Sequence, residues 1–510
     1  MKRFNTLQFP DMKRSIRYAG FLVAFGLVTC LSVRLQAQDY TGFSGSNYAG
    51  VHGVYFNPAS IADSRYAVDV NVVGFSFQFA NDFLELRNDG FLGIGNLGES
   101  YDDWTDFRQK ALIVNFDGAR SGQKANVFLG IDVMGPSALI SLSPKDAIAL
   151  GVRYRALVNF DEVGAEAARL AIDEFVYPPL WGRNFESDGA SLDAMTWIEY
   201  FGSYGRTVWQ DGEHVVKAGV TLKLLQGAAA LYLHADELNY NFTNDDILTL
   251  EESTIQYGHT DNFDVNREEF EIKFFSTLGF GADLGLIYEW RPEGAAYSGR
   301  MRDETVASGD RSATRYKLRV GASLMDFGGV RFDRDPKSYD RPAGAIDIDD
   351  WDLTVVEFDA LQDFDDTLNI RFPEQAGDLD EKFGMNLPLA LNLHADYQLY
   401  KGLYVGAAAW LAPKSPGDVN KVHGITRLSL NPRFEHRWFE AGLPLSYQNF
   451  SGTDFGMYLR LGPVVLGSAN FFTEAFSDGV ESINAYMALK IPLLHGRSTS
   501  SVDSEEYNQY

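Results

Sequence analysis

The chain has 510 residues and a formal net charge of −26 at neutral pH. So acidic a protein repels phosphate backbones at long range, which argues against nucleic-acid binding. Its 37 Phe, 25 Tyr and 48 Gly suit β-strands, aromatic girdles and tight turns. No apolar run of about 20 residues follows the N-terminal region, so a helical membrane protein is not expected.

The N-terminus has the pattern of an export signal. A basic stretch precedes an apolar run over 21–33, and the sequence around Ala37 offers a cleavage site. The apolar run is too short to span a bilayer comfortably. We therefore expect a signal peptide over 1–37, which is cleaved near Ala37. Because Cys30, the single cysteine, would be removed with it, the mature chain would hold no disulfide and no thiolate site.

Strict alternation of apolar and polar residues recurs through the rest of the chain. In 316–324 the even positions are apolar and the odd positions are Lys, Arg, Gly and Ser, a period of two that predicts a strand with one apolar face. An outer-membrane barrel turns that face to lipid, whereas a soluble periplasmic sandwich turns it inward, and alternation alone does not separate the two. The strands expected before the last third of the chain cover residues 66–79, 111–116, 125–133, 147–160, 195–208, 215–225, 229–241, 270–289 and 316–324.

Five or six closely spaced strands follow between 391 and 491, which brings the expected total to about 14, within a range of roughly 12 to 18. One helix is expected over 162–176, where apolar residues recur at helical spacing. The longest irregular region, 327–383, is rich in Asp. Its closest carboxylates lie between Asp347 and Asp352, but this run lacks the Gly and the distal Glu of a calcium loop, so no metal site is expected. A polar tail over 495–510 is expected to be disordered.

Two segments carry a resemblance to known barrels. Asn57-Pro58-Ala59, shortly after the signal, resembles the N-terminal hatch of FadL-type outer-membrane barrels, a group that includes PorV-like components of type IX secretion. The segment 459–468, with 432–435, is similar to an uncharacterised barrel family of type IX-secreting bacteria. The resemblance implies a hatch within 38–65, with Asn57, Pro58 and Ala59 as hatch residues, and a barrel over 66–494.

In FadL-type channels, displacement of the hatch opens a path for an apolar substrate. The sequence shows no apolar pocket for such a substrate, because the face inferred to line the lumen is charged. The inferred lumenal charges include Arg153, Arg155, Lys217, Lys317, Arg319, Asp396, Arg427, Arg433, Glu435 and Arg460. They could form a ring that selects anions, or a ladder of salt bridges that fills and closes the barrel. The second interpretation is favoured, since buried charges need partners whether or not anything passes.

Catalysis has little support in the sequence. None of the eight histidines lies in a known hydrolase or metalloprotease motif. His394 and Asp396 share a strand face and could approach Ser429, but a hydrogen-bonded lumenal histidine is the favoured interpretation. We expect no enzyme and no cofactor.

The sequence thus predicts an exported all-β protein: an antiparallel transmembrane β-barrel of the outer membrane, with a small N-terminal hatch and one loop helix. The expected function is transport or a channel-like role. The alternative is a non-conducting structural or docking component of surface secretion or gliding machinery. Expected partners are outer-membrane lipid and secretion or surface-lipoprotein partners.

Overall fold

The computed structural model describes residues 40–88, 104–115, 123–173, 175–244, 247–260, 277–292, 316–335, 338, 346–352, 365, 381–414 and 420–495. The expected signal peptide, the polar tail beyond 495 and most of the acidic region 327–383 lie outside these residues.

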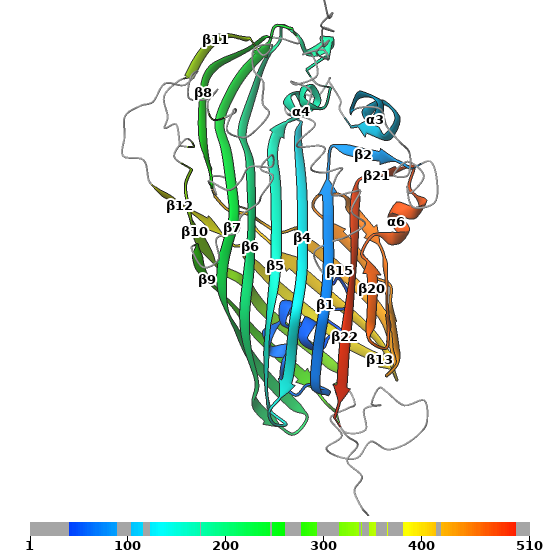
Figure 1. Cartoon of the computed structure of the whole chain (residues 1–510). Helices are drawn as coiled ribbons and strands as arrows, with labels where there is room; N and C mark the ends of the chain where they lie inside the picture. Colours follow the sequence, from blue (N-terminus) through cyan, green and yellow to red (C-terminus); the bar gives the residue numbers. More distant parts are fainter. Residues whose placement is uncertain are drawn as a thin grey trace, which may run out of the picture.

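The chain folds into a closed antiparallel barrel of 14 strands, as the sequence predicts (Figure 1). Pairing of β1 with β22 closes the barrel. In four places two short segments together make one barrel strand. In chain order the barrel strands are β1 (Tyr66–Asn81), β4 (Lys124–Ser141), β5 (Asp146–Gly164), β6 (Asn184–Asp211), β7 (His214–Phe242), β8 (Ile247–His259) with β9 (Leu278–Trp290), β10 (Leu318–Asp333), β12 (Lys382–Asn386) with β13 (Ala390–Tyr400), β14 (Leu403–Leu411), β15 (Arg427–Glu435), β16 (Phe439–Gly442) with β17 (Leu445–Gln448), β18 (Gly452–Phe455) with β19 (Met457–Leu461), β20 (Val464–Ser468) and β22 (Ser482–Leu494).

We call the end of the barrel where β4 meets β5 and β6 meets β7 the turn end, and the opposite end the loop end. Smaller elements gather at the loop end (Figure 1). They are a sheet of β2 (Leu84–Arg87), β3 (Leu112–Val114) and β21 (Gly479–Val480), strand β11 (Ile346–Asp352) paired to β8, and helices α3 (Trp104–Ala111), α4 (Ala165–Ile172), η5 (Pro178–Leu180) and α6 (Phe471–Phe476). Among the described residues, no helix is both long and apolar enough to cross a bilayer.

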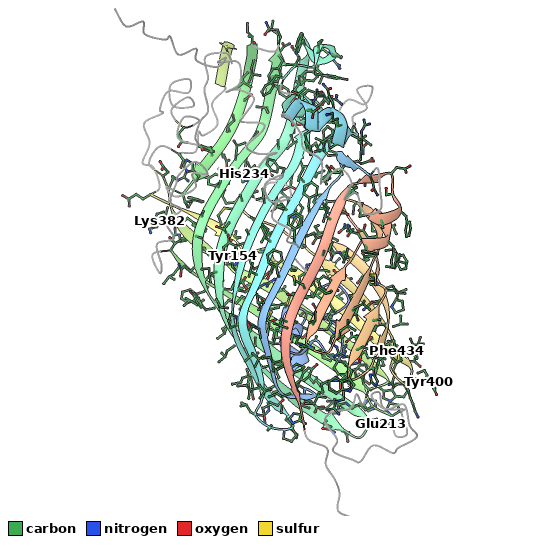
Figure 2. All side chains as sticks on the ribbon, turned by 45° about the vertical axis from the view of Figure 1, so that its right-hand side comes forward. Tyr154, Glu213, His234, Lys382, Tyr400 and Phe434 are labelled. Carbon is green, nitrogen blue, oxygen red and sulfur yellow. The ribbon has the colours of Figure 1, made fainter. Side chains whose placement is uncertain are left out.

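Alternation along the strands gives the barrel an apolar outer face. On β13, Leu391 and Leu393 are exposed outside, whereas His394 and Asp396 are buried inside. Phe280 on β9 is 73% exposed. Side chains project from both faces of the wall along its height, with Tyr154 midway and Glu213 and Tyr400 at the turn end (Figure 2). An apolar exterior around a polar interior is the arrangement of a barrel in lipid.

The wall is taller on the side of β6 and β7, which have 28 and 29 residues. A bilayer requires about 9–11 residues per strand, so these strands extend well beyond it. The two strands predicted at 215–225 and 229–241 are in fact one, β7. The small residues from Gly227 to Ala230 interrupt the alternation of side chains, but the backbone pairing with β6 continues past them with one register shift.

Several further boundaries differ from the prediction, among them those of the helix and of β9. Strand β5 runs to Gly164, so the helix expected over 162–176 begins at Ala165 and ends at Ile172. Strand β9 begins at Leu278 rather than near 270, and residues 261–276 lie outside the described ranges.

Candidate functional site

Residues 40–62 lie inside the lower half of the barrel and form a plug (Figure 1). Two short 3₁₀ helices, η2 (Gly50–Tyr55) and η3 (Pro58–Ile61), shape it. Val51 and Val54 are fully buried in a cluster with Phe201 of the wall. Phe43 packs against Tyr458 with ring centroids 6.1 Å apart. The segment expected as a hatch therefore occupies the lumen.

Asn57 fixes the turn between the two 3₁₀ helices. Its Oδ1 accepts a hydrogen bond from the Ala59 amide at 2.9 Å, which caps η3, and Pro58 occupies the first helical position. Its Nδ2 donates to the carbonyls of Leu286 and Ala322, both at 3.1 Å. One buried side chain thus joins the plug to two neighbouring strands.

Three glycines on neighbouring strands form the surface on which this turn rests. Gly205 on β6 pairs with Gly219 on β7, and Gly219 pairs with Gly285 on β9. A Cβ atom at Gly219 would lie 2.3 Å from the carbonyl carbon of Pro58, and one at Gly285 would lie 2.1 Å from Oδ1 of Asn57. Since only glycine permits so close an approach, this glycine row is the seat of the plug.

Backbone carbonyls of the plug are held by wall side chains. The Phe56 carbonyl accepts hydrogen bonds from Oγ of Ser323 and Nδ2 of Asn392, both at 2.7 Å. The Lys490 ammonium donates to the Tyr48 carbonyl at 3.1 Å. These bonds satisfy two backbone carbonyls of the plug.

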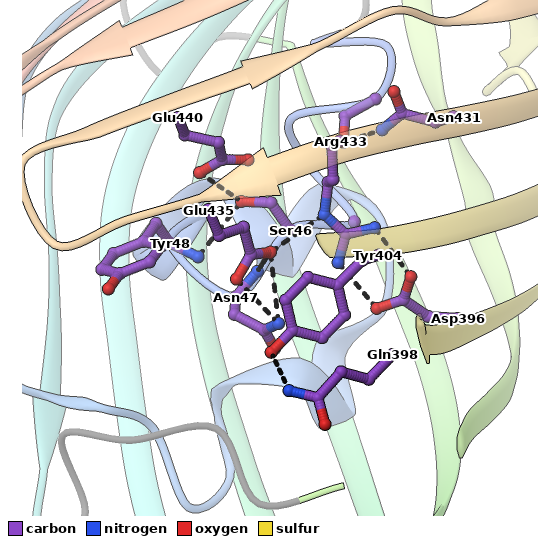
Figure 3. A network of polar contacts seen from close by, with 12 residues as sticks. Ser46, Asn47, Tyr48, Asp396, Gln398, Tyr404, Asn431, Arg433, Glu435 and Glu440 are labelled. Atoms are coloured by element: carbon purple, nitrogen blue, oxygen red, sulfur yellow. Dashed lines mark hydrogen bonds and ion pairs between the residues drawn. The ribbon is translucent and has the colours of Figure 1, made fainter. Parts of the chain in front are cut away.

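A charged network holds the other side of the plug (Figure 3). The backbone amide of Asn47 donates to Oε1 of Glu435 at 3.0 Å, and its Nδ2 lies 3.0 Å from Oε2. Arg433 contacts the same Glu435 at 2.9 Å and binds both oxygens of Asp396 at 2.7 Å. The Arg433 and Asp396 pair is bidentate, the strongest common geometry for such ions.

A second charged layer lies directly above the plug. Arg155 contacts Glu199 at 3.0 Å and Asp326 at 2.8 Å. Lys223 contacts Asp283 at 2.8 Å and also bonds to Asp326. Each cation of this layer therefore has at least two carboxylates, which satisfies the charges inside the lumen.

The structure places nine of the ten predicted lumenal residues inside the barrel, each with a hydrogen-bonded or ion-paired partner there. These are Arg153, Arg155, Lys217, Arg319, Asp396, Arg427, Arg433, Glu435 and Arg460.

Lys317 is the exception, and its predicted lumenal position is wrong. Its ammonium lies 4.9 Å from the ring centroid of Tyr397, a residue of the outer face. Lys317 precedes β10, so it lies outside the regular alternation of that strand. Tyr316, expected on the apolar outer face, instead bonds to lumenal Asp396.

An apolar layer fills the lumen on the loop-end side of these charges. It combines side chains from strands on most sides of the barrel, which meet in one buried cluster. Its members include Phe128, Leu157, Met195, Trp197, Leu225, Tyr232, Val330, Phe332, Phe383, Met385, Val422, Ile425 and Phe450. The sequence predicted a charged lumen, and this apolar layer was not predicted.

Strand β5 shows why it was missed. From the turn end upward its inward residues include Arg153, Arg155, Leu157, Asn159 and Asp161, so one leucine stands among charged and polar groups. Leu157 is the residue of β5 that indicates the apolar layer, because an apolar side chain on the polar face of a strand is expected to pack against other apolar side chains. Asp326 was missed because a bulge with positive φ, 58°, directs it inward.

Part of the apolar layer comes from a segment between β14 and β15. We call residues 412–426 the inserted segment, of which 412–414 and 420–426 are described. Its Val422 and Ile425 are buried in the apolar layer. Asn159 holds it by two hydrogen bonds to the backbone of His423, at 3.0 and 3.2 Å.

An ion pair adds to this attachment. Nε2 of His423 lies 3.0 Å from both oxygens of Asp161, and Lys414 contacts Asp161 at 2.7 Å. Lys414 also bonds to Ser191 at 2.8 Å. The inserted segment is thereby fixed to β5 and β6.

Small cavities separate these layers. One of about 80 Å³ lies between the plug and the inserted segment, where Tyr55, Arg155 and Ile425 line it. Another of about 70 Å³ lies on the turn-end side of the plug, lined by Ser46 and Lys217 among others. Each has room for a few water molecules.

His394 lies beside the plug. Its ring is 4.7 Å from that of Phe56. Ser429 lies two strands away, because His394 pairs with Ala408 and Ala408 with Ser429. The histidine thus packs against the plug.

Residues 58–472 match a family described as a family of unknown function (DUF5723). The chain belongs to this family. None of the curated proteins matches it.

Among solved structures, the chain is similar to a Pseudomonas aeruginosa FadL homologue, with 10% identity over 90% of this chain and 97% of that chain, at a TM-score of 0.37. The Ralstonia pickettii toluene transporter TbuX has 9% identity over 88% of this chain and 94% of its own chain, at a TM-score of 0.32. The P. putida toluene transporter TodX has 10% identity over 88% of this chain and 95% of its own chain, at a TM-score of 0.35.

Proposed function

We propose that this protein is an outer-membrane transport protein for small apolar or amphipathic molecules. Its apolar exterior suits a position in the bilayer, with the turn end in the periplasm and the loop end outside the cell. The plug and the inserted segment occupy the lumen, so transport requires both to move aside.

The observation that carries this proposal is the apolar layer inside the lumen. An apolar constriction opposes ion passage because it excludes water. It can however bind an apolar molecule, because ligand sites are concave, largely apolar spaces with a few polar groups. Val422 and Ile425 of the inserted segment fill part of this space and would be replaced by the ligand.

The pairing of the lumenal cations supports the same conclusion. Salt bridges in the charged layer and at the plug leave most of these cations engaged with carboxylates, which disfavours an anion-selecting ring. We therefore propose that the lumen is a gated path and not a permanently open aqueous pore.

A docking role is the second candidate, and one feature of the outer face favours it. A depression of about 1290 Å³ crosses β9, β10, β13, β14, β15 and β17, where small side chains such as Ala407 and Ala409 form its floor. Such a surface could receive a membrane partner, including the secretion partners that the resemblance to type IX barrels implies.

Uptake in cells tests the proposed transport. We would express the protein in a Gram-negative host and follow entry of N-phenyl-1-naphthylamine, an apolar fluorophore that intact outer membranes exclude. Expression should accelerate entry, and Leu157→Lys, which places a charge in the apolar layer, should abolish the gain. Asp188→Lys, at an exposed position near the loop end, is the matched control.

Planar-bilayer conductance separates the alternatives. A transport protein of this kind gives fluorophore uptake with little steady conductance. Steady conductance without uptake would replace the proposal by an open pore. If neither fluorophore uptake nor conductance is observed, the transport proposal fails and the docking role remains.

A further inference from the structure

His259, Asp335 and Asp365 gather at the loop end of the barrel. His259 ends β8, Asp335 follows β10, and Asp365 belongs to the acidic region 327–383. One donor atom from each lies within 4.8 Å of the other two. Nε2 of His259 is 2.9 Å from Oδ2 of Asp365.

The surroundings orient this histidine. Its Nδ1 lies 2.8 Å from the Thr260 carbonyl, which can only accept, so Nδ1 carries a proton. Nε2 therefore faces the carboxylates. The Tyr257 hydroxyl donates to Oδ1 of Asp365 at 3.0 Å, which leaves Oδ2 toward the histidine. Imidazole bonded to a carbonyl and carboxylate bonded to a second donor are the usual outer contacts of metal ligands.

We propose that His259, Asp335 and Asp365 bind a divalent transition-metal ion of the zinc class. One imidazole nitrogen and two carboxylate oxygens match zinc, with a fourth position left for water. Calcium and magnesium prefer all-oxygen sites, so they fit less well. His259 and Asp365 are only 4% and 2% exposed, so the imidazole and one of the carboxylates are shielded from water.

His423 provides an internal comparison. Its Nδ1 also faces the carbonyl of the next residue, Gly424, at 2.9 Å. Its Nε2, however, faces the two oxygens of a single carboxylate, Asp161, which the Lys414 ammonium already contacts at 2.7 Å. The Lys414 ammonium thus occupies the place that a metal ion would take, and it pairs with the single carboxylate of Asp161. The second carboxylate is what distinguishes the His259 site.

The bound ion would join three parts of the chain. It would fix Asp365 to His259, at the end of β8, and to Asp335, two residues after the end of β10. This consequence is independent of transport, because it concerns the loop end of the barrel and not the plug.

Zinc binding by the purified protein tests the proposal. The full chain would be purified in detergent without a histidine tag, stripped with a chelator and titrated with ZnCl₂ by calorimetry. We expect one tight equivalent. His259→Gln and Asp365→Asn should each weaken it about 100-fold or more, whereas His423→Gln should leave it unchanged. X-ray absorption should show nitrogen and oxygen ligands.

Tyr257→Phe keeps all three ligands and should weaken binding about 10-fold. Heat-dependent gel migration would reveal whether His259→Gln folds. If it does not fold, Tyr257→Phe still tests whether this site binds the metal. Absence of tight binding to the wild-type protein would overturn the proposal. Equal binding by wild type, His259→Gln and Tyr257→Phe would overturn it as well.

Discussion

Gly219 of the wall and Pro58 of the plug approach so closely that a Cβ atom on Gly219 would lie 2.3 Å from the Pro58 carbonyl carbon. Gly219 pairs with Gly205 on one side and Gly285 on the other, so the close approach extends over three strands. The Asn-Pro-Ala turn therefore needs a matching surface far away in the sequence. Both halves of the contact can be tested separately.

Gly219→Ala should loosen the plug without unfolding the barrel. Overpacking of this kind costs about 1–3 kcal/mol, and the plug can relieve it by moving away. Hydrogen exchange of residues 50–61 should accelerate. Gly202→Ala on β6 is the control, because a Cβ there would meet only a side-chain atom of Leu150, at 3.4 Å. Equal exchange in both variants would show that the glycine row does not seat the plug.

Asn57 should tolerate neither Ala nor Asp. Alanine removes the cap and two hydrogen bonds to the wall, at a cost of about 2–3 kcal/mol. Aspartate keeps the acceptor for Ala59 but places a carboxylate against the carbonyls of Leu286 and Ala322. We therefore expect faster exchange of the plug in Asn57→Asp than in Asn57→Ala. The opposite order would mean that the cap matters more than the bonds to the wall.

Asp396→Asn should destabilise the network beside the plug, because it leaves Arg433 buried with less negative charge around it. Breaking a buried pair costs about 3–5 kcal/mol. Replacing both partners, as Asp396→Asn with Arg433→Met, should recover part of this loss. Urea unfolding in detergent measures the coupling through a double-mutant cycle. Additive effects would show that Asp396 and Arg433 are not energetically coupled, which would contradict the proposed role of the pair.

Alternation predicts an all-β chain of many strands, but it does not show whether the apolar faces turn to lipid or to a core. The pattern of an export signal and the resemblance to known barrels favoured the membrane barrel. The hatch was predicted from resemblance to known barrels through Asn57, Pro58 and Ala59. Its seat was not predictable, since Gly205, Gly219 and Gly285 meet only after the strands have found their register.

For the lumenal charges too, the sequence shows the direction of a side chain but not its partners. Arg153 and Arg155 follow the alternation of β5, so their inward direction is visible in the sequence. Their partners lie elsewhere: Asp132 on β4, Glu199 on β6 and Asp326 at a bulge. The apolar layer is a further example, because most strands contribute only one or two members. A single inward leucine such as Leu157 indicates burial, but it does not show which other strands complete the layer.

Asp161→Asn should release the inserted segment, because it removes the carboxylate shared by His423 and Lys414. The two hydrogen bonds from Asn159 remain, so the effect should be partial. Protease cleavage within 412–426 should become faster, and fluorophore uptake should rise if the segment gates the lumen. Asp188→Asn, at an exposed position on β6, is the control. Faster cleavage without greater uptake would separate the segment from transport.

Glu474 on α6 predicts a pH dependence at the loop end. Burial raises the pKa of its carboxyl from 4.5 to about 8, and the negative charge of Asp454 adds to the shift. The carboxyl is hydrogen-bonded to Ser482 at 3.0 Å and to Asn470 at 3.3 Å. The folded protein thus binds a proton that the unfolded chain releases above its lower pKa, so stability falls as the pH rises from about 4.5 to 8.

The expected loss for α6 between pH 5 and pH 9 is on the order of 2 kcal/mol, because one pKa unit corresponds to about 1.4 kcal/mol and part of the side chain is solvated. Glu474→Gln is neutral throughout this range and should abolish the dependence. Hydrogen exchange of α6, corrected for the intrinsic effect of pH, measures it. Glu186→Gln, at an exposed position on β6, should retain the wild-type profile. A profile that Glu474→Gln leaves unchanged would assign the dependence to another group.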